Sequence, residues 1–406
     1  MNLLNLRRYC NKLRFVGMKR EYRLNELFDL QMGKTPARKN PEYWNSEDHK
    51  WISIADLSNC GKYIVDTKEY ISDRAVEESG ISLIPKNTVI MSFKLSIGKT
   101  AITSEPMYSN EAIMSFRDKH IIELLPDYLY YMFSGQDWEA GTNKAVMGKT
   151  LNKATLSGMY VKVHSIEEQR KIIAVLDKMK VVLDSRKEEL EKLDELIKAR
   201  FVEMFGMPGS DSRGWGLTTL GDCCEINPKK NKDSRLAPGL EVSFVPMPAV
   251  SENGVIDATD IRLYDEVKTG FTYFSENDVL FAKITPCMEN GKGAVATKLH
   301  NGIGFGSTEF HVLRPYVGES DPYWIYYLTT FETFRQDAEK KMTGSAGQRR
   351  VPATFLKEYK TALPPIELQK RFANFVQQVD KSKVAVQKSL EKTQLLFNSL
   401  MQEYFG

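Results

Sequence analysis

The chain has 406 residues, of which 42% are hydrophobic and 27% charged, with a formal net charge of +3. This length suffices for two domains with separate cores, and the composition excludes an intrinsically disordered chain. Because the charge is only mildly basic, any contact with nucleic acid must be local. No apolar run approaches the roughly 20 residues of a membrane span.

Cysteine and histidine usage gives no sign of a metal centre. The five cysteines include no Cys-x-x-Cys pair, and the five histidines are scattered along the chain. An odd number of cysteines without regular spacing is typical of reduced thiols in the cytoplasm. The sequence therefore predicts a cytoplasmic protein with no membrane partner, no metal ion and no cofactor.

The N-terminal residues 1–20 form a basic arm. The arm lacks the serine richness of a transit peptide, so we expect either a frayed end or a translated extension upstream of Met18. Residues 21–165 then form the first globular domain. Its apolar and alternating runs predict strands at 51–55, 88–93 and 121–124 and a helix at 127–133.

A duplication sets the plan of the whole chain. Residues 163–206 and 363–406 share ten identities without a gap, including the string Ile-Glu-x-Gln near the start of each segment. A repeat this long duplicates a domain together with its helix and is not a solenoid. The sequence thus predicts a second globular domain at 207–365 and long helices at 166–206 and 366–406.

The two globular domains resemble each other less than the two helices do. Leu217–Leu220 is expected to match Leu24–Leu27, and the apolar run that ends at Lys283 is expected to match the run that ends at Lys94. The aromatic string Pro322–Tyr327 matches the predicted helix of the first domain. Two domains that have diverged in this way are expected to recognise different surfaces.

Apolar residues at alternating steps of four and three predict a coiled-coil seam on each long helix. Polar residues interrupt the seams and either fix the register or snorkel towards water. We predict an α+β fold in which two similar α/β domains are joined by two long antiparallel coiled-coil helices with pseudo-two-fold symmetry. The seam candidates are Leu176, Leu183, Leu190, Ile197, Val376, Val379, Leu390 and Phe397, and the interruptions are Arg186, Arg200, Lys383 and Thr393.

Catalytic motifs are not recognisable in the sequence. Gly-Lys-Thr occurs at 33–35, 98–100 and 148–150, but none of these strings has the earlier glycine of a P-loop. Acid-x-Lys pairs such as Asp48 and Lys50 resemble parts of nuclease sites, although several are expected by chance in so charged a chain. We predict no catalytic residue, and a metal-dependent nuclease is the enzymatic alternative.

Basic and amide residues in Gly-rich, turn-forming strings are the candidates for contacting DNA. Glycine allows close backbone approach, Lys and Arg neutralise phosphate, and Gln or Arg can read base edges. Such strings occur in both halves of the chain, which favours binding over ordinary polar loops. The candidates are Lys34, Thr35, Arg38, Lys94, Lys99, Lys149, Lys283, Lys292, Gln348, Arg349 and Arg350.

Taken in order, these strings resemble the specificity subunits of type I restriction-modification systems over nearly the whole chain. Gly33–Pro36 followed by Trp51–Leu57 is similar to the opening of the family's target-recognition domains. Phe281–Lys292 resembles a string common in those domains. So does Gly344–Arg350, which leads into Leu363–Gln369.

The resemblance implies a non-catalytic subunit with two target-recognition domains joined by antiparallel helices. Each domain would read one half of a bipartite, asymmetric site on double-stranded DNA, and the helices would fix the gap between the halves. Two modification (methyltransferase) subunits would dock on the helices, and motor-nuclease restriction subunits would complete the complex. The non-enzymatic alternative is a coiled-coil scaffold whose domains bind proteins.

Two features depart from the family pattern, both in the first domain. Residues 141–150 stand where the second domain has Gly344–Arg350, and they share little with that string. The glutamine usual after Asn110 is replaced by Glu111. The contacts of the first domain are therefore expected to follow the family less closely.

Overall fold

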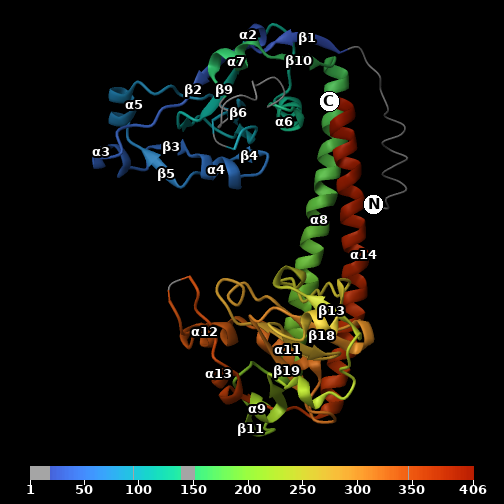
Figure 1. Ribbon diagram of the computed structural model, residues 1–406. Helices are drawn as coiled ribbons and strands as arrows, with labels where there is room; N and C mark the ends of the chain where they lie inside the picture. Colours follow the sequence, from blue (N-terminus) through green and yellow to red (C-terminus); the bar gives the residue numbers. More distant parts are fainter. Residues whose placement is uncertain (1–18, 95, 139–150, 346) are drawn as a thin grey trace. The chain divides into compact units, whose positions relative to one another are not determined.

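The computed structural model describes residues 19–94, 96–138, 151–345 and 347–406 (Figure 1). The chain divides into two compact units: unit 1 combines the residues up to 187 with 388–406, and unit 2 contains 188–387. Each unit holds one half of each of two 40-residue helices, α8 (Ile166–Phe205) and α14 (Ile366–Phe405). The part of each unit outside these helices is called head 1 or head 2.

The described part of head 1 contains sheets of five, three and two strands, in the orders β2-β9-β6-β7-β4, β5-β3-β8 and β1-β10. Phe133 of helix α6 packs edge-on against Phe28 and Phe116 of the large sheet and so anchors the helix there. The elements are β1 (Arg20–Arg23), α2 (Leu24–Leu27), β2 (Phe28–Met32), α3 (Pro41–Trp44), β3 (His49–Ile52), α4 (Ile54–Asn59), β4 (Tyr63–Ile64), β5 (Glu69–Ile71), α5 (Asp73–Ser79), β6 (Val89–Ser92), β7 (Thr100–Thr103), β8 (Tyr108–Ser109), β9 (Ile113–Asp118), α6 (Pro126–Gly135), α7 (Lys153–Gly158) and β10 (Tyr160–Val163).

The described part of head 2 contains two four-stranded sheets, β12-β19-β16-β17 and β14-β13-β18-β15, and the pair β11-β20. Phe334 of helix α12 packs edge-on against Phe281 of the first sheet. The elements are β11 (Leu217–Thr219), α9 (Leu220–Cys223), β12 (Cys224–Ile226), η1 (Lys230–Lys232), β13 (Glu241–Val245), η2 (Met247–Ala249), β14 (Ile261–Leu263), α10 (Tyr264–Val267), β15 (Thr272–Ser275), β16 (Val279–Ala282), β17 (Gly293–Val295), η3 (His300–Gly302), β18 (Ile303–Gly306), β19 (Phe310–Pro315), α11 (Pro322–Thr330), α12 (Glu332–Lys340), α13 (Ala353–Glu358) and β20 (Lys360–Ala362).

The two heads share one strand plan. The antiparallel run β2-β9-β6-β7 of head 1 corresponds to β12-β19-β16-β17 of head 2. The parallel pair β3-β8 corresponds to β13-β18, and the antiparallel pair β1-β10 corresponds to β11-β20. The duplication and the α+β class predicted from the sequence are confirmed.

A buried glutamine ties each head to the long helix that follows it. Gln169 and Gln369, the glutamines of the two Ile-Glu-x-Gln strings, are 1% and 0% exposed. Each makes three hydrogen bonds of 2.7–3.1 Å to backbone groups, two donated and one accepted. These bonds explain why the glutamine returns in the repeat. The partners of Gln169 are Glu123 O, His164 O and Leu125 N, and those of Gln369 are Glu319 O, Pro364 O and Asp321 N.

Replacing Gln369 with leucine is expected to lower the free energy of unfolding of unit 2 by about 2–5 kcal/mol. Leucine fills the space but leaves one N–H and two carbonyl groups without this partner, in a place that water does not reach. Urea denaturation would measure the loss. The matched control is Gln378→Leu, at an exposed position of the same helix. A loss no larger than that of the control would contradict the role given to Gln369.

In each unit the beginning of one long helix packs against the end of the other. The first half of α8 and the second half of α14 share an apolar cluster in unit 1, and the other two halves share one in unit 2. The two helix segments are therefore antiparallel in both units. Among the seam candidates, Leu176, Leu183, Ile197, Val376 and Val379 are buried, whereas Leu190, Leu390 and Phe397 are half-buried.

Lys383, one of the polar residues that interrupt the seams, bridges the helix pair within unit 2. Its ammonium group pairs with Asp194 of α8 and lies 3.6 Å from Asp380 Oδ1, and its side chain is only 15% exposed. Because an ion pair between two helices requires one particular register, this contact favours register fixing over snorkelling at Lys383. Thr393 instead turns back on its own helix and donates to the Ser389 carbonyl at 2.8 Å.

Two details of the sequence interpretation are wrong. Residues 121–124 form no strand, and α6 begins at Pro126, after the N-cap residue Leu125. Leu24 and Leu220 each begin a short helix, so Leu220 matches Leu24 and the expected alignment of the two leucine strings is shifted by three residues. Each string has leucines three positions apart, so the sequence alone fits either alignment. The pairing of β1 with β10 and of β11 with β20 shows which alignment is correct.

Candidate nucleic-acid interface

Three loop segments of head 2 are joined by backbone hydrogen bonds. The Lys283 N–H donates to the Glu309 carbonyl and the Val351 N–H donates to the Lys283 carbonyl, both at 2.9 Å. The Thr285 N–H donates to the Arg349 carbonyl at 3.1 Å. The string after β16 and the string before α13 therefore lie side by side, which brings two of the predicted basic loops together beside the start of β19.

Arg350 is held by both carboxylate oxygens of Glu309. Its Nε and Nη2 donate to them at 2.9 Å each, and its Nη1 donates to the Gln348 carbonyl at 3.2 Å. The bond from Arg350 is the main cause that lowers the pKa of Glu309. A guanidinium group has five N–H donors, so one on each terminal nitrogen is left over by these three bonds. The side chain is 41% exposed, so a ligand can reach those donors.

The other predicted residues of head 2 lie in different surroundings. Arg349 Nη2 lies 3.1 Å from Glu339 Oε1 and 3.9 Å from Glu289 Oε1. Gln348 is exposed. Lys292 donates to the Met247 carbonyl at 3.4 Å, in the segment that follows β13.

Lys283 is half-buried between these groups. Burial is the main cause that lowers the pKa of its ammonium group, and nearby Arg350 lowers the pKa further, while Glu309 opposes the shift. Within the described residues its ammonium group donates no hydrogen bond. A half-buried cation of this kind is stabilised by an anion supplied from outside.

His311 of β19 is buried, and Lys283 lies near it. Its Nε2 donates to the Val351 carbonyl at 2.8 Å, and its Nδ1 lies 3.0 Å from Asn227 Nδ2, which fits the neutral imidazole. Burial is the main cause that lowers the pKa of His311, and Lys283 adds to it, whereas Val351 and Glu309 act in the opposite sense. The ring is therefore a neutral support of the loop that carries the arginines.

Head 2 is expected to lose stability as the pH falls through the range in which unfolded histidine takes up a proton. Because the pKa of His311 is lower in the folded state, the unfolded state binds the proton first, and the stabilisation present at neutral pH is lost below about pH 6.5. Urea midpoints at several pH values would show the decline. His311→Gln should flatten it, whereas the control His120→Gln, at an exposed residue, should not. Equal pH dependence of parent and His311→Gln would contradict the assignment.

In head 1 the Gly-Lys-Thr string after β2 lies against the segment before β9. The Lys34 N–H donates to the Ser109 carbonyl at 2.8 Å, and the Thr35 hydroxyl donates to the Glu111 carboxylate. A Cβ atom at Gly33 would lie 2.2 Å from the Ser109 carbonyl oxygen, so only glycine permits this approach. The bond from Thr35 is the main cause that lowers the pKa of Glu111.

Arg38 is fixed in head 1 by an ion pair and two aromatic rings. Both terminal nitrogens donate to the Glu69 carboxylate, and the guanidinium carbon lies 3.9 Å from the ring centre of Trp44 and 4.7 Å from that of Trp51. Arg38 and Lys94 also lower the pKa of Glu111, although less than Thr35 does. These predicted residues therefore gather around one carboxylate.

The remaining candidates of head 1 do not join this group. The Lys34 ammonium donates to the Ser79 carbonyl, and Lys99 is exposed after the turn that precedes β7. Lys149 lies outside the described residues.

Strand register shows that the basic residues of the two heads are not at equivalent positions. Strand β6 pairs with β9 in the same register in which β16 pairs with β19. In this register Lys283 matches Phe93, so the expected match with Lys94 is wrong by one residue. Glu309 likewise matches Ala112, one residue after Glu111. The segment after β6 runs antiparallel to the segment before β9, so Lys94 and Glu111 of head 1 both lie one residue further from the paired strands than Lys283 and Glu309 do in head 2. The two heads therefore present different surfaces.

The sequence interpretation found the cations but missed most of their carboxylate partners. Glu309 and Glu69 were not singled out, and Glu111 was noted only as a departure from a family pattern. A signal was present, since Ser-x-Glu precedes both β9 and β19, at Ser109–Glu111 and Ser307–Glu309. In a chain with 27% charged residues, a single carboxylate cannot be assigned to a site until the structure shows which cation it pairs with.

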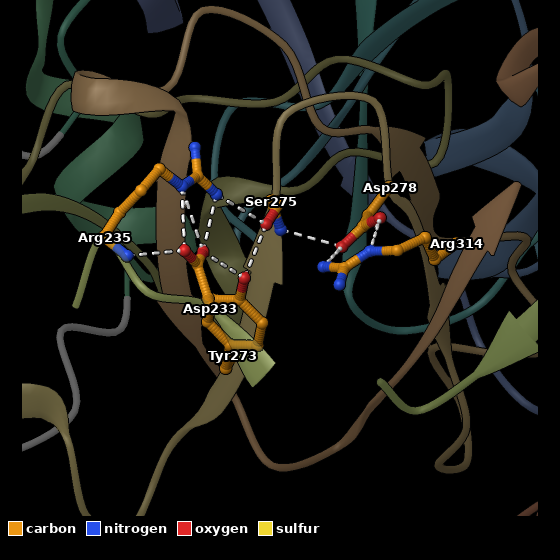
Figure 2. A network of polar contacts seen from close by, with 6 residues as sticks. All are labelled: Asp233, Arg235, Tyr273, Ser275, Asp278 and Arg314. Carbon is orange, nitrogen blue, oxygen red and sulfur yellow. Dashed lines mark hydrogen bonds and ion pairs between the residues drawn. The ribbon is translucent and has the colours of Figure 1, made fainter. Parts of the chain in front are cut away.

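A polar network joins the two four-stranded sheets of head 2 (Figure 2). The Tyr273 hydroxyl lies 2.6 Å from Asp233 Oδ2 and 2.7 Å from Ser275 Oγ, and the Ser275 N–H donates to Asp278 at 2.7 Å. Arg314 of β19 donates two hydrogen bonds of 2.8 and 2.6 Å to Asp278. Strand β19, which Glu309 precedes, and strand β16, which Lys283 follows, are therefore both tied to β15.

The described residues show little of the nuclease-like arrangement that the sequence left open. Lys50 binds Glu105 at 2.6 Å and lies 3.6 Å from Asp66, so it is engaged in surface ion pairs. In the described part of the chain no three His, Cys, Asp or Glu side chains form a group that could hold a metal ion. None of the helices described there combines the length and the hydrophobicity needed to cross a bilayer.

Both halves of the chain match one family of DNA-recognition domains. The family described as the type I restriction modification DNA specificity domain matches residues 17–195 and 212–395. The two matches follow the duplication seen in the strand plan. The chain belongs to this family.

Individual relatives carry related names but align over part of their length. The EcoAI specificity subunit of Escherichia coli is 40% identical over 161 residues, which are 39% of this chain and 26% of that protein. The MjaIX specificity subunit of Methanocaldococcus jannaschii is 24% identical over 283 residues, 64% of this chain and 65% of that protein. The chain thus spans about a quarter of the first relative and under two thirds of the second.

Two solved structures share the fold over almost the whole chain. One is a chain of a type I R-M system studied for complex assembly and conformational transition, with a TM-score of 0.59, 18% identity, and coverage of 96% of this chain and 98% of that one. The other is the type I restriction-modification S subunit from M. genitalium, with a TM-score of 0.53, 14% identity, and coverage of 97% and 98%. At these identities the likeness shows the fold alone.

Proposed function

We propose that the chain is the DNA-binding specificity subunit of a type I restriction-modification complex and is itself non-catalytic. It reads a bipartite, asymmetric site on double-stranded DNA, one half-site for each head, and directs methyltransferase and restriction subunits to that site. The observation that supports this most strongly lies in head 2 of the duplicated fold, where backbone hydrogen bonds join the segments that carry Lys283, Arg349 and Arg350.

Base readout in head 2 is assigned to Arg350. Glu309 orients the guanidinium group, and the two N–H donors that remain on the terminal nitrogens match the bidentate contact that an arginine makes with guanine O6 and N7. Gln348, which is exposed in the same loop, can pair with adenine. Arg349 and Lys283 are expected to neutralise phosphates, and so is Lys292.

Head 1 is assigned a different half-site. Its Arg38 lies against two tryptophan rings and pairs with a carboxylate, an arrangement that the described residues do not repeat at Arg350. Lys94 and Thr35 flank it around Glu111, and Lys34, Lys99 and Lys149 are proposed as phosphate contacts. Because the lysine and glutamate are displaced by one residue between the heads, the two half-sites should differ in sequence.

The remaining parts of the chain are assigned to assembly. We propose target-recognition domains at 21–165 and 207–365, conserved helices at 166–206 and 366–406, and a basic arm at 1–20. Two modification subunits dock on the helices, and motor-nuclease restriction subunits join that complex. The antiparallel helix segments of each unit support this, since they present similar surfaces twice.

Footprinting of the chain assembled with its modification subunits tests the proposal. Two protected stretches separated by a gap of unprotected bases are expected, with affinity that falls steeply as salt rises. A scaffold that binds only proteins would retain no DNA even at low salt. Protection of a single continuous stretch would contradict the assignment of one half-site to each head.

A further inference from the structure

A basic cavity opens on head 2 at Lys283, whose carbonyl accepts from Val351, the residue after the string Gly344–Arg350, here called the arginine loop. Its volume is about 400 Å³, and it is lined by Asn227, Pro228 and Lys230, by residues 268–273, and by Lys283 and Phe310. Lys230, Lys268 and Lys283 all line it, and no acidic side chain is among the lining residues. Three cations around so small a space form a site for an anion.

Of the three lysines of this cavity, only Lys268 has an ion-pair partner among the described residues. Lys230 donates to the Lys268 carbonyl, which fixes the direction of its side chain, and no described carboxylate compensates its charge. Lys268 lies 2.9 Å from Asp265, in a surface pair of which both members are more than a third exposed. Because exposed pairs are weak and the Lys283 ammonium group donates no hydrogen bond to a described residue, the cavity keeps a positive potential.

The cavity is also rigid. Tyr273 forms part of its wall and is anchored through its hydroxyl to Asp233 at 2.6 Å (Figure 2). The Asp233 N–H in turn donates to the Lys230 carbonyl at 2.9 Å, so the segment that carries Lys230 is fixed against β15. The charge of Asp233 is matched by Arg235 at 2.6 Å, so this carboxylate does not cancel the lysines. A preformed site loses little entropy when it binds.

We propose that this cavity binds one backbone phosphate of the DNA that carries the second half-site. The inference rests on the proposed function and extends it, because Lys230 and Lys268 are not among the DNA-contacting residues predicted from the sequence. Lys283 lines the cavity and is hydrogen-bonded to Val351, next to Arg350, so a phosphate held here lies close to the base that Arg350 is proposed to read. Phe271 and Phe310 supply apolar walls that suit a deoxyribose and offer nothing to a base edge.

Salt-dependent DNA binding tests this site. The chain assembled with its modification subunits would be titrated with a duplex carrying its site, between about 50 and about 200 mM salt. In the double variant Lys230→Gln/Lys268→Gln, the slope of log affinity against log salt is expected to fall by about 1, with equal losses on cognate and scrambled duplexes. The control variant Lys340→Gln/Lys341→Gln, on the exposed end of α12, should keep the parent slope.

A second arm locates the contacted phosphate on the duplex. Neutral methylphosphonates placed one at a time along the duplex should reveal one position that weakens the parent but not the double variant. An unchanged slope in the double variant would overturn the inference, and so would a loss confined to the cognate duplex, which would mean base reading. A parent without any site preference would overturn the proposed function and the inference together, whereas a site-specific parent with an unaffected variant would overturn the inference alone.

Discussion

Replacing Arg350 with alanine is expected to weaken binding to the second half-site by about 1–3 kcal/mol, or roughly 5- to 150-fold. The variant loses both N–H donors proposed to contact guanine. It also releases Glu309, whose carboxylate would then stand unpaired at the interface. Arg349→Ala should weaken the same half-site less, because its guanidinium group is already shared between two glutamates. Competition between duplexes altered in one half-site at a time would measure both effects.

The informative controls for Arg350 keep part of the interaction. Arg350→Lys keeps the positive charge but loses the two parallel N–H donors of the guanidinium group. Compared with Arg350→Ala, it should therefore recover attraction to the DNA phosphates but not discrimination at the guanine. Glu309→Gln keeps the shape of the support and should relax discrimination at the same base without changing the first half-site. If Arg350→Ala and the parent gave equal footprints on both half-sites, the assignment of base readout to Arg350 would be wrong.

Replacing Arg314 with methionine is expected to destabilise unit 2 by about 3–5 kcal/mol. Asp278 is 2% exposed at its side chain and receives two hydrogen bonds from Arg314 (Figure 2). Without the arginine, a carboxylate would stay buried without its counter-charge. The loss should shrink in mild acid, because protonation of Asp278 removes the buried charge.

Chemical denaturation of the full chain would measure this loss, with Lys340→Met as the matched control. Lys340 pairs with Asp337 on the surface, where both side chains are at least half exposed, so its replacement should cost little. If Arg314→Met and Lys340→Met unfolded at the same denaturant concentration, the network of Figure 2 would not be what joins the two sheets.

The domain organisation of this fold could be predicted from the sequence because the sequence contains an internal repeat. The two helices, their antiparallel packing and the related heads follow from repeated strings and apolar periodicity. Details set by pairing could not be predicted. An apolar run at 121–124 lacks a strand because Leu124 joins the core beside α6, and the leucines at 217–220 fit two alignments equally well.

The candidate site could be predicted only as a set of cations. Lys283 and Arg350 were found because basic residues in turn-forming strings stand out in a nearly neutral chain. Their meeting with Glu309 depends on strand register, which no local pattern in the chain encodes. Lys230 and Lys268 were missed because each is an ordinary surface lysine until the fold places both around one cavity.

The most direct test of the central claim is single-molecule methylation mapping of genomic DNA from cells with and without this gene. If the chain specifies the site of a modification complex, one bipartite, asymmetric adenine-methylated motif should vanish when the gene is deleted and return when it is restored. Restoration with Arg350→Ala should return the motif weakly or with its second half relaxed. In cells whose modification subunits are active, an unchanged set of methylated motifs after deletion would contradict the claim.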